Sequence, residues 1–151
     1  MMPSDNCFNL IKKEEGLRLK AYPDPATGGD PITIGYGSTR YEDGSKIKLG
    51  DVITEERATY LLRLDVARRC IVLASLVAPT RINQNQVDAL LSFIYNVGIG
   101  AFEKSTLLKK VKTNPFDQSI RTEFMKWKRA GGKVLPGLEK RRIQEANLYF
   151  G

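Results

Sequence analysis

Two carboxylates, Glu15 and Asp24, lie nine residues apart near the start of the chain, and Thr33 follows in a glycine-interrupted segment. A pair of carboxyl groups can hydrolyse a glycosidic bond, because one protonates the leaving oxygen while the other activates water or attacks the sugar. Taken singly, the residues have ordinary explanations: a solvated glutamate at a helix end and an aspartate that forms a turn. The three together predict a site for acid–base chemistry.

The residues around Glu15 suit the role of a proton donor. Gly16 predicts a helix end, since glycine adopts the left-handed conformation at no steric cost. Glu15 then lies in the last turn, where exposed carbonyls disfavour a charged carboxylate, as a general acid requires. Phe8, Ile11 and Glu15 follow helical spacing, so Glu15 should point inward. Glu14, beside that stripe, is the weaker candidate.

Asp24 and Thr33 are expected in stiff or extended backbone. Asp24 stands between two prolines, which fix their own φ and bias the preceding residue towards extended geometry. Thr33 opens a predicted strand whose period of two places Thr33, Gly35 and Gly37 on one face. A hydroxyl beside two glycines would leave room for a sugar to approach the backbone.

The elements that must position these residues are mostly helices. Polar caps predict several starts: Ser4 or Asp5, Thr54, the capping box that begins at Asn83, and Ser105. We expect helices over residues 4–15, 54–77, from 83 to the glycines at 98 and 100, 105–112, 115–130 and 137–149, and strands over 17–22, 32–37 and 46–48.

Several of these segments resemble a known family. Glu-Gly-Leu-Arg-Leu (15–19), Ala-Tyr-Pro-Asp (21–24) and Thr-Ile-Gly-Tyr-Gly (33–37) are similar to the phage lysozymes (endolysins) of glycoside hydrolase family 24, the family of the T-even phage lysozyme. The resemblance covers nearly the whole chain in the family's order. It continues through Asn96-Val97-Gly98, Phe102 with 105–108, Phe124 with Trp127, 130–132, and Gly137-Leu138 followed by Arg141-Arg142.

The resemblance implies an α+β fold that is mostly α. In such a lysozyme-like, two-lobed fold, a small antiparallel β-sheet lobe and a larger helical lobe are joined by a long helix. We expect a single lysozyme domain over residues 1–151, with the small lobe at about 16–53 and the bridging helix and helical lobe at about 54–151.

The resemblance also assigns roles residue by residue. Glu15 matches the family's general acid, Asp24 its second carboxylate and Thr33 its cleft threonine. Tyr95 and Asn96 match positions at the cleft side of the core helix, where they would bind substrate; the alternative is core packing plus a helix-end amide.

Two further positions bear on the resemblance. Arg141 or Arg142 would lie near Glu14 and Glu15, the alternative being a surface charge on the final helix. Ser38 stands where many relatives carry a histidine, so an ion pair of that histidine cannot form here.

Composition narrows the function class. The 151 residues carry a net charge of +7 that is scattered in pairs and triplets, which suits an anionic partner without a massed basic tail. No apolar run is long enough for a transmembrane helix, and the N-terminus lacks the pattern of a signal peptide.

The chain has no histidine and two cysteines, Cys7 and Cys70, without CxxC spacing. This excludes Ser-His-Asp chemistry and histidine-ligated zinc, and it argues against a cysteine–histidine nucleophile. We expect two reduced, semi-buried thiols, no metal and no cofactor.

The resemblance implies hydrolysis, with inversion, of the β-1,4 bond between N-acetylmuramic acid and N-acetylglucosamine in bacterial peptidoglycan. The enzyme would act as a monomer, without nucleic acid or membrane insertion. It would stay in the host cytoplasm until a holin-type membrane permeabiliser releases it to the wall, and host lysis would follow.

Two alternatives remain. A lytic transglycosylase would use a glutamate alone and leave an anhydro sugar; Asp24 and Thr33 argue against it. A non-catalytic basic helical module could bind nucleic acid, which the net charge permits but no clustered basic helix supports.

Overall fold

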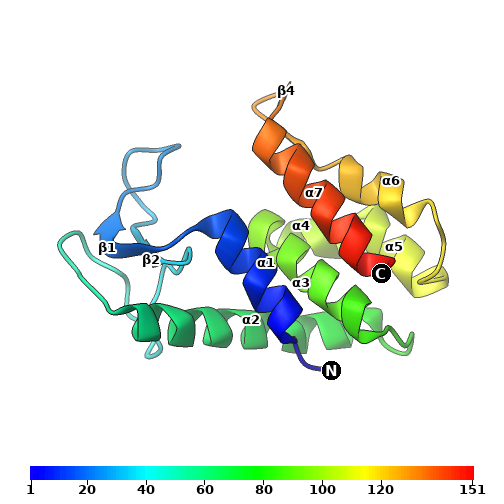
Figure 1. Ribbon diagram of the computed structural model, residues 1–151, viewed down its shortest axis with the longest axis horizontal. Coiled ribbons are helices and arrows are strands. Elements are labelled where there is room, and N and C mark those ends of the chain that lie inside the picture. The colour runs from blue at the N-terminus through cyan, green and yellow to red at the C-terminus, as the bar shows by residue number, and fades with distance from the viewer. The chain divides into compact units, whose positions relative to one another are not determined.

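The computed structural model describes residues 1–151, which form two compact units (Figure 1). The helical unit comprises residues 1–7 and 69–151, and the small unit comprises residues 8–68. The boundaries fall inside two helices, α1 (Asp5–Glu15) and α2 (Glu55–Val77), so each of these helices contributes to both units. The predicted class is confirmed, because most elements are helices and the two sheets are small and antiparallel.

The small unit contains a β-hairpin of β1 (Arg18–Tyr22) and β2 (Thr33–Gly35). Arg18 pairs with Gly35 and Tyr22 with Thr33, so four residue steps on β1 face two on β2. β1 therefore bulges. Beneath the hairpin, apolar side chains of the β-region and α2 form a core that includes Ile34, Tyr36, Ile47, Ala58, Leu61 and Leu62.

The third strand predicted over 46–48 is wrong. Only Lys46 forms an isolated bridge, with Arg40. The amide of Lys48 instead donates to the Asp51 carboxylate at 3.0 Å, which turns the chain. The backbone that runs along the other edge of β1 belongs to residues 51–53, because the Ala21 amide donates to the Asp51 carbonyl at 2.9 Å.

The helical unit contains seven of the named elements in full: α3 (Gln84–Val97), α4 (Ile99–Glu103), α5 (Thr106–Thr113), α6 (Ile120–Met125), the hairpin β3 (Arg129–Ala130) and β4 (Lys133–Val134), and α7 (Pro136–Tyr149). α7 packs against both α3 and α6 (Figure 1). At the centre, the buried ring of Phe93 on α3 meets Phe102, Phe124 and Trp127 edge to face.

Three of the four predicted caps are confirmed, whereas the Ser4 hydroxyl before α1 donates to the Asp88 carboxylate. Thr54 Oγ1 accepts from the Arg57 amide at 3.1 Å at the start of α2. Asn83 and Gln86 form a reciprocal capping box at the start of α3. Ser105 Oγ accepts from the Leu108 amide at 3.1 Å at the start of α5. These local patterns fix where the helices begin whatever their tertiary partners.

Two helix predictions for the second half are wrong in part. Residues 115–119 form turns instead of the start of α6, because Asn114 and Asp117 carboxamide and carboxylate oxygens accept from the amides of Phe116 and Ser119. Gly98 does end α3, but Gly100 lies inside α4. Residues 129–130 belong to β3, not to the predicted helix.

The β3–β4 hairpin arises at the glycine pair. Gly131 and Gly132 both take positive φ, at 58° and 79°, and so close a two-residue turn between paired strands. The two glycines predict a break in the chain, but the short strands on either side carry too little pattern to predict a hairpin.

Arg141 and Arg142 are both buried, so the alternative of a surface charge on the final helix is wrong. Within α7, Arg141 Nε lies 3.3 Å from Glu145 Oε2 and Arg142 Nε lies 2.8 Å from Glu145 Oε1. The Ser92 hydroxyl of α3 donates to the same carboxylate at 2.6 Å. Burial raises the pKa of Glu145, whereas the two guanidiniums and the hydroxyl act in the opposite direction. Two buried cations therefore share one carboxylate.

Removing that carboxylate should be severe. We expect Glu145→Ala to lower the free energy of unfolding by about 3–5 kcal/mol, because it removes the carboxylate that two buried guanidiniums share. Urea unfolding followed by circular dichroism measures the loss.

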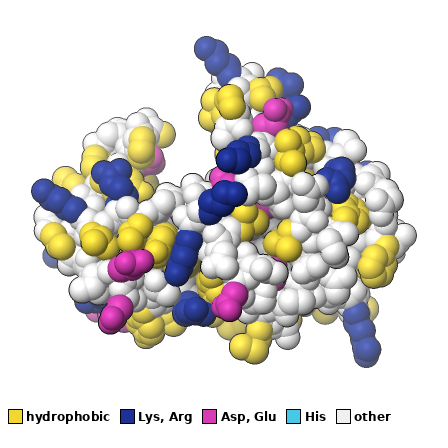
Figure 2. Space-filling model, viewed as in Figure 1, with side chains coloured by type: hydrophobic (Ala, Val, Ile, Leu, Met, Phe, Trp, Pro, Cys, Tyr) yellow, Lys and Arg dark blue, Asp and Glu magenta, His cyan; other side chains and the backbone are white.

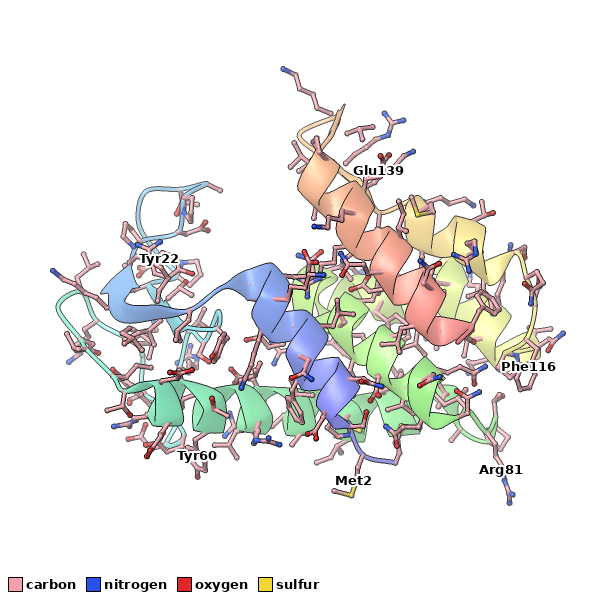
Figure 3. All side chains as sticks on the ribbon, viewed as in Figure 1. Met2, Tyr22, Tyr60, Arg81, Phe116 and Glu139 are labelled. Atoms are coloured by element: carbon pink, nitrogen blue, oxygen red, sulfur yellow. The ribbon has the colours of Figure 1, made fainter.

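Glu139→Ala is the matched control on the same helix. Glu139 (labelled in Figure 3) makes a longer and partly exposed pair with Lys128, at 3.6 Å, so its loss should cost at most about 1 kcal/mol. Equal losses for the two variants would contradict the assignment of a buried charge network.

Candidate active site

Glu15 ends α1 as predicted. Gly16 takes a φ of 72°, and its amide donates to the Lys12 carbonyl at 3.0 Å, which closes the last turn. Phe8 and Ile11 on the same stripe are buried, and Glu15 itself is half-buried. The helix end thus presents this carboxylate at the margin of the small unit's core.

Asp24 is fixed by a tight loop directly after β1. Its Oδ1 accepts from the Ala26 amide at 3.0 Å, and its carbonyl accepts from the Gly28 amide at 2.7 Å. Asp24 therefore does form a turn, as its ordinary explanation predicts. Oδ2 makes no hydrogen bond, so the turn holds one oxygen and leaves the other available.

Thr33 begins β2 directly opposite Tyr22 of β1. Its hydroxyl donates to the Pro31 carbonyl at 3.1 Å. Because the proton is engaged there, the lone pairs of Oγ1 remain as hydrogen-bond acceptors.

Tyr22 pairs with Thr33 and is influenced by the charges of Glu15 and Asp24. The sequence alone did not single it out. It lies at the end of β1 beside the loop that carries Asp24 (Figure 3). Burial raises the pKa of its hydroxyl, Arg18 lowers it, and the charges of Glu15 and Asp24 both raise it. The Arg18 guanidinium lies over its ring, 4.3 Å from the centroid. Both carboxylates therefore act electrostatically on the same phenol.

The predicted glycine face of β2 is wrong. Gly35 takes a φ of 68°, and a Cβ placed there would lie 3.2 Å from the Ala58 Cβ, so this glycine allows α2 to approach. Gly37 lies beyond the strand, in a turn closed by two 2.9 Å hydrogen bonds between the backbones of Ile34 and Ser38. These glycines serve packing and turning, and they do not open the strand to a sugar.

Ser38 is buried and donates from Oγ to Asp65 Oδ2 at 2.8 Å. The contact ties the turn after β2 to α2. A charge-assisted hydrogen bond to a serine thus connects this position to the helix.

Tyr95 and Asn96 lie in the last turn of α3, within the helical unit. Tyr95 is half-buried with the Arg69 guanidinium 5.0 Å from its ring centroid. Asn96 is exposed, and its Oδ1 accepts from Arg142 Nη2 at 2.8 Å. The buried arginine therefore orients an exposed amide.

The cysteine and acidic residues bear on whether the protein could use a metal or a thiol. No group of three or more His, Cys, Asp or Glu residues is arranged to hold a metal ion. Cys7 and Cys70 are free and buried, as expected, and burial raises the pKa of both thiols.

The molecular surface shows no massed basic region on the face in view. Lys and Arg side chains are spread over it among apolar and acidic ones (Figure 2). None of the helices has both the length and the apolar character needed to cross a bilayer.

Comparison with known proteins shows the family of the chain. The family model described as phage lysozyme matches residues 12–145. The chain belongs to the phage lysozyme family. The resemblance predicted from the sequence, and with it the prediction of a hydrolase of the lysozyme type, is confirmed.

Individual relatives of this phage lysozyme family member match over almost its whole length. It is 46% identical to the endolysin of Bacillus phage B103 over 95% of its own length, but it spans only about half (52%) of that relative. A crystal structure of a point mutant of P22 lysozyme is 38% identical, with a TM-score of 0.85 over 100% of this chain and 99% of that one. The muramidase domain of SpmX from Asticcacaulis excentricus is 33% identical, with a TM-score of 0.83 over 98% of this chain and 97% of that domain.

The role assigned to Gly35 can be tested. Gly35→Ala should destabilise this phage lysozyme family member by about 1–2 kcal/mol for the left-handed backbone, plus a further loss from the crowding against Ala58. Thermal unfolding measures the change.

Gly44→Ala is the matched control, since Gly44 also has a positive φ, 86°, but open space around it. It should show the backbone loss alone. If the two substitutions were equally destabilising, Gly35 would not serve the packing of α2.

Proposed function

We propose that this lysozyme cleaves bacterial peptidoglycan at the β-1,4 bond between N-acetylmuramic acid and N-acetylglucosamine. Membership of the phage lysozyme family supports this, as do relatives named endolysin and one named a muramidase domain. The observation that carries the proposal is local: the charges of Glu15 and Asp24 both raise the pKa of the Tyr22 hydroxyl, and Tyr22 pairs with Thr33 in the β1–β2 hairpin.

Glu15 is proposed as the general acid. It is half-buried at the C-terminus of α1. As the acid it would donate its proton to the glycosidic oxygen as the bond breaks, which makes the sugar a better leaving group.

Asp24 and Thr33 are proposed to hold the attacking water. Asp24 Oδ2 makes no hydrogen bond, and the Thr33 hydroxyl proton is engaged by the Pro31 carbonyl. Asp24 Oδ2 and Thr33 Oγ1 can therefore each accept a hydrogen bond from the same water molecule. With both protons held, the water would direct a lone pair at the anomeric carbon, and the Asp24 carboxylate would take up the proton that is released. Attack from the face opposite the leaving group inverts the configuration.

Tyr95 and Asn96 are proposed as substrate contacts. Asn96 offers an exposed amide whose oxygen is engaged by Arg142, so its NH₂ group remains as a donor to sugar oxygens or acetamido carbonyls. Tyr95 would contact an apolar face of the sugar.

We further propose a setting for this activity. The enzyme would accumulate as a monomer in the host cytoplasm and reach the wall when a holin-type partner permeabilises the membrane. Its net charge of +7 would draw it to the anionic wall. Host lysis would follow from the cut glycan strands.

Glu15→Gln is the direct test of the acid. The amide keeps the shape but cannot give a proton, so lysis of permeabilised cells should fall by at least the ~10²–10⁴-fold typical of acid–base catalysis. A turbidity assay measures the rate, and circular dichroism confirms the fold.

The neighbouring Glu14→Gln removes the same charge and is expected to leave lysis within a few-fold of wild type. Loss of activity in this control, with activity retained in Glu15→Gln, would assign the acid to Glu14.

A further inference from the structure

The small unit contains a cavity of about 320 Å³ that none of the roles above uses. Its walls come from three segments, residues 30–32, 39–40 and 46–47. This volume lies within the range of sites that bind small molecules in proteins. The cavity is large enough for one amino-acid residue of a ligand.

Two cations face each other at this cavity. Arg40 and Lys46 are opposed across an antiparallel bridge, and neither forms an ion pair. The only hydrogen bond of the Arg40 side chain runs from Nη1 to the Gly44 carbonyl, at 3.0 Å, and Lys46 makes none. Opposed like charges destabilise a strand pair, so an anion bound between them would relieve a repulsion.

The remaining walls supply an apolar floor and one carboxylate. Ile32 is half-buried and offers surface to an aliphatic chain, and the largely buried Ile47 also lines the cavity. Asp30 lines the same cavity and has no ion pair. Two cations, a short aliphatic floor and one anion together complement a zwitterionic amino-acid end joined to methylene groups.

The cavity adjoins the proposed catalytic residues along the chain. Residues 30–32 lead directly into Thr33, whose hydroxyl bonds to the Pro31 carbonyl. Three extended residues span at most about 11 Å, so Asp30 lies no further than this from Thr33. The third residue of a peptide attached to muramic acid can extend over the same distance, roughly 10 Å.

We propose that this cavity binds the diamino-acid residue of the stem peptide attached to muramic acid, when that residue has a free zwitterionic end, as in meso-diaminopimelate. The proposal rests on the proposed function, which makes peptidoglycan the substrate. The terminal carboxylate lies between Arg40 and Lys46, the ammonium faces Asp30, and the methylene groups contact Ile32 and Ile47.

The test is an NMR titration of the ¹⁵N-labelled full chain with the tripeptide L-alanyl-γ-D-glutamyl-meso-diaminopimelate. We expect saturable shifts of amides in residues 30–32, 39–40 and 46–47, with an affinity of about millimolar. The same peptide with L-lysine in third position keeps the methylenes and the ammonium but lacks the side-chain carboxylate of diaminopimelate. It should bind roughly tenfold more weakly.

Variants locate the binding groups. Lys46→Gln alone, and together with Arg40→Gln, should weaken binding of the diaminopimelate peptide roughly tenfold or more. The single variant matters because Arg40 also supports the turn at Gly44. Lys20→Gln with Lys48→Gln removes the same net charge from exposed positions that do not line the cavity, and it should bind as wild type.

The outcomes separate this inference from the proposed function, because binding is measured without catalysis. Absent shifts, equal binding of the two peptides, or equal losses in the control variant would overturn the inference. Hydrolysis of intact peptidoglycan by the wild type is measured alongside. Hydrolysis without peptide binding overturns the cavity assignment alone, whereas peptide binding without hydrolysis supports the cavity and contradicts the proposed function.

Discussion

The pairing of Tyr22 with Thr33 in the β1–β2 hairpin is the constraint on which the candidate site depends. It places Thr33 beside Tyr22, which lies two residues before Asp24. The bulge in β1 takes up the extra length of that strand. The hairpin is in turn held to α2 by the close approach of Gly35 to Ala58 and by the Ser38–Asp65 hydrogen bond. A change in this register would move Thr33 away from the loop that carries Asp24.

The helical unit depends on a different kind of interaction. Glu145 lies between two buried arginines and the Ser92 hydroxyl, and one of these arginines also holds the amide of Asn96. Breaking such a buried network by removing one partner costs more than the intact network adds to stability. The proposed substrate contact at Asn96 is thereby tied to the packing of the core.

Much of this could be predicted from the sequence, because it is local. Helix caps at Thr54, Asn83 and Ser105, and the glycine ends at Gly16 and Gly98, depend on hydrogen bonds a few residues apart. The motifs around Glu15, Asp24 and Thr33 pointed to the family that the comparisons confirm.

What the sequence could not reveal depends mostly on distant partners. Gly35 looked like an opening in a strand because its neighbour Ala58 is 23 positions away in the sequence. The burial of Arg141 and Arg142 depends on Glu145 and on Ser92 of another helix. Turns at 114–119 replaced a predicted helix because short polar side chains bond the nearby backbone, which apolar spacing alone does not reveal.

The central claim is that Asp24, with Thr33, directs water across the glycosidic bond that Glu15 protonates. The configuration of the first product tests it most directly. Proton NMR of freshly cut muropeptides should show the α-anomer at muramic acid before mutarotation mixes the signals, because attack by water from the opposite face inverts the centre. An initial β-anomer would make Asp24 a nucleophile or a bystander. A 1,6-anhydro product would mean that water does not attack, and it would contradict the proposed roles of both Asp24 and Thr33.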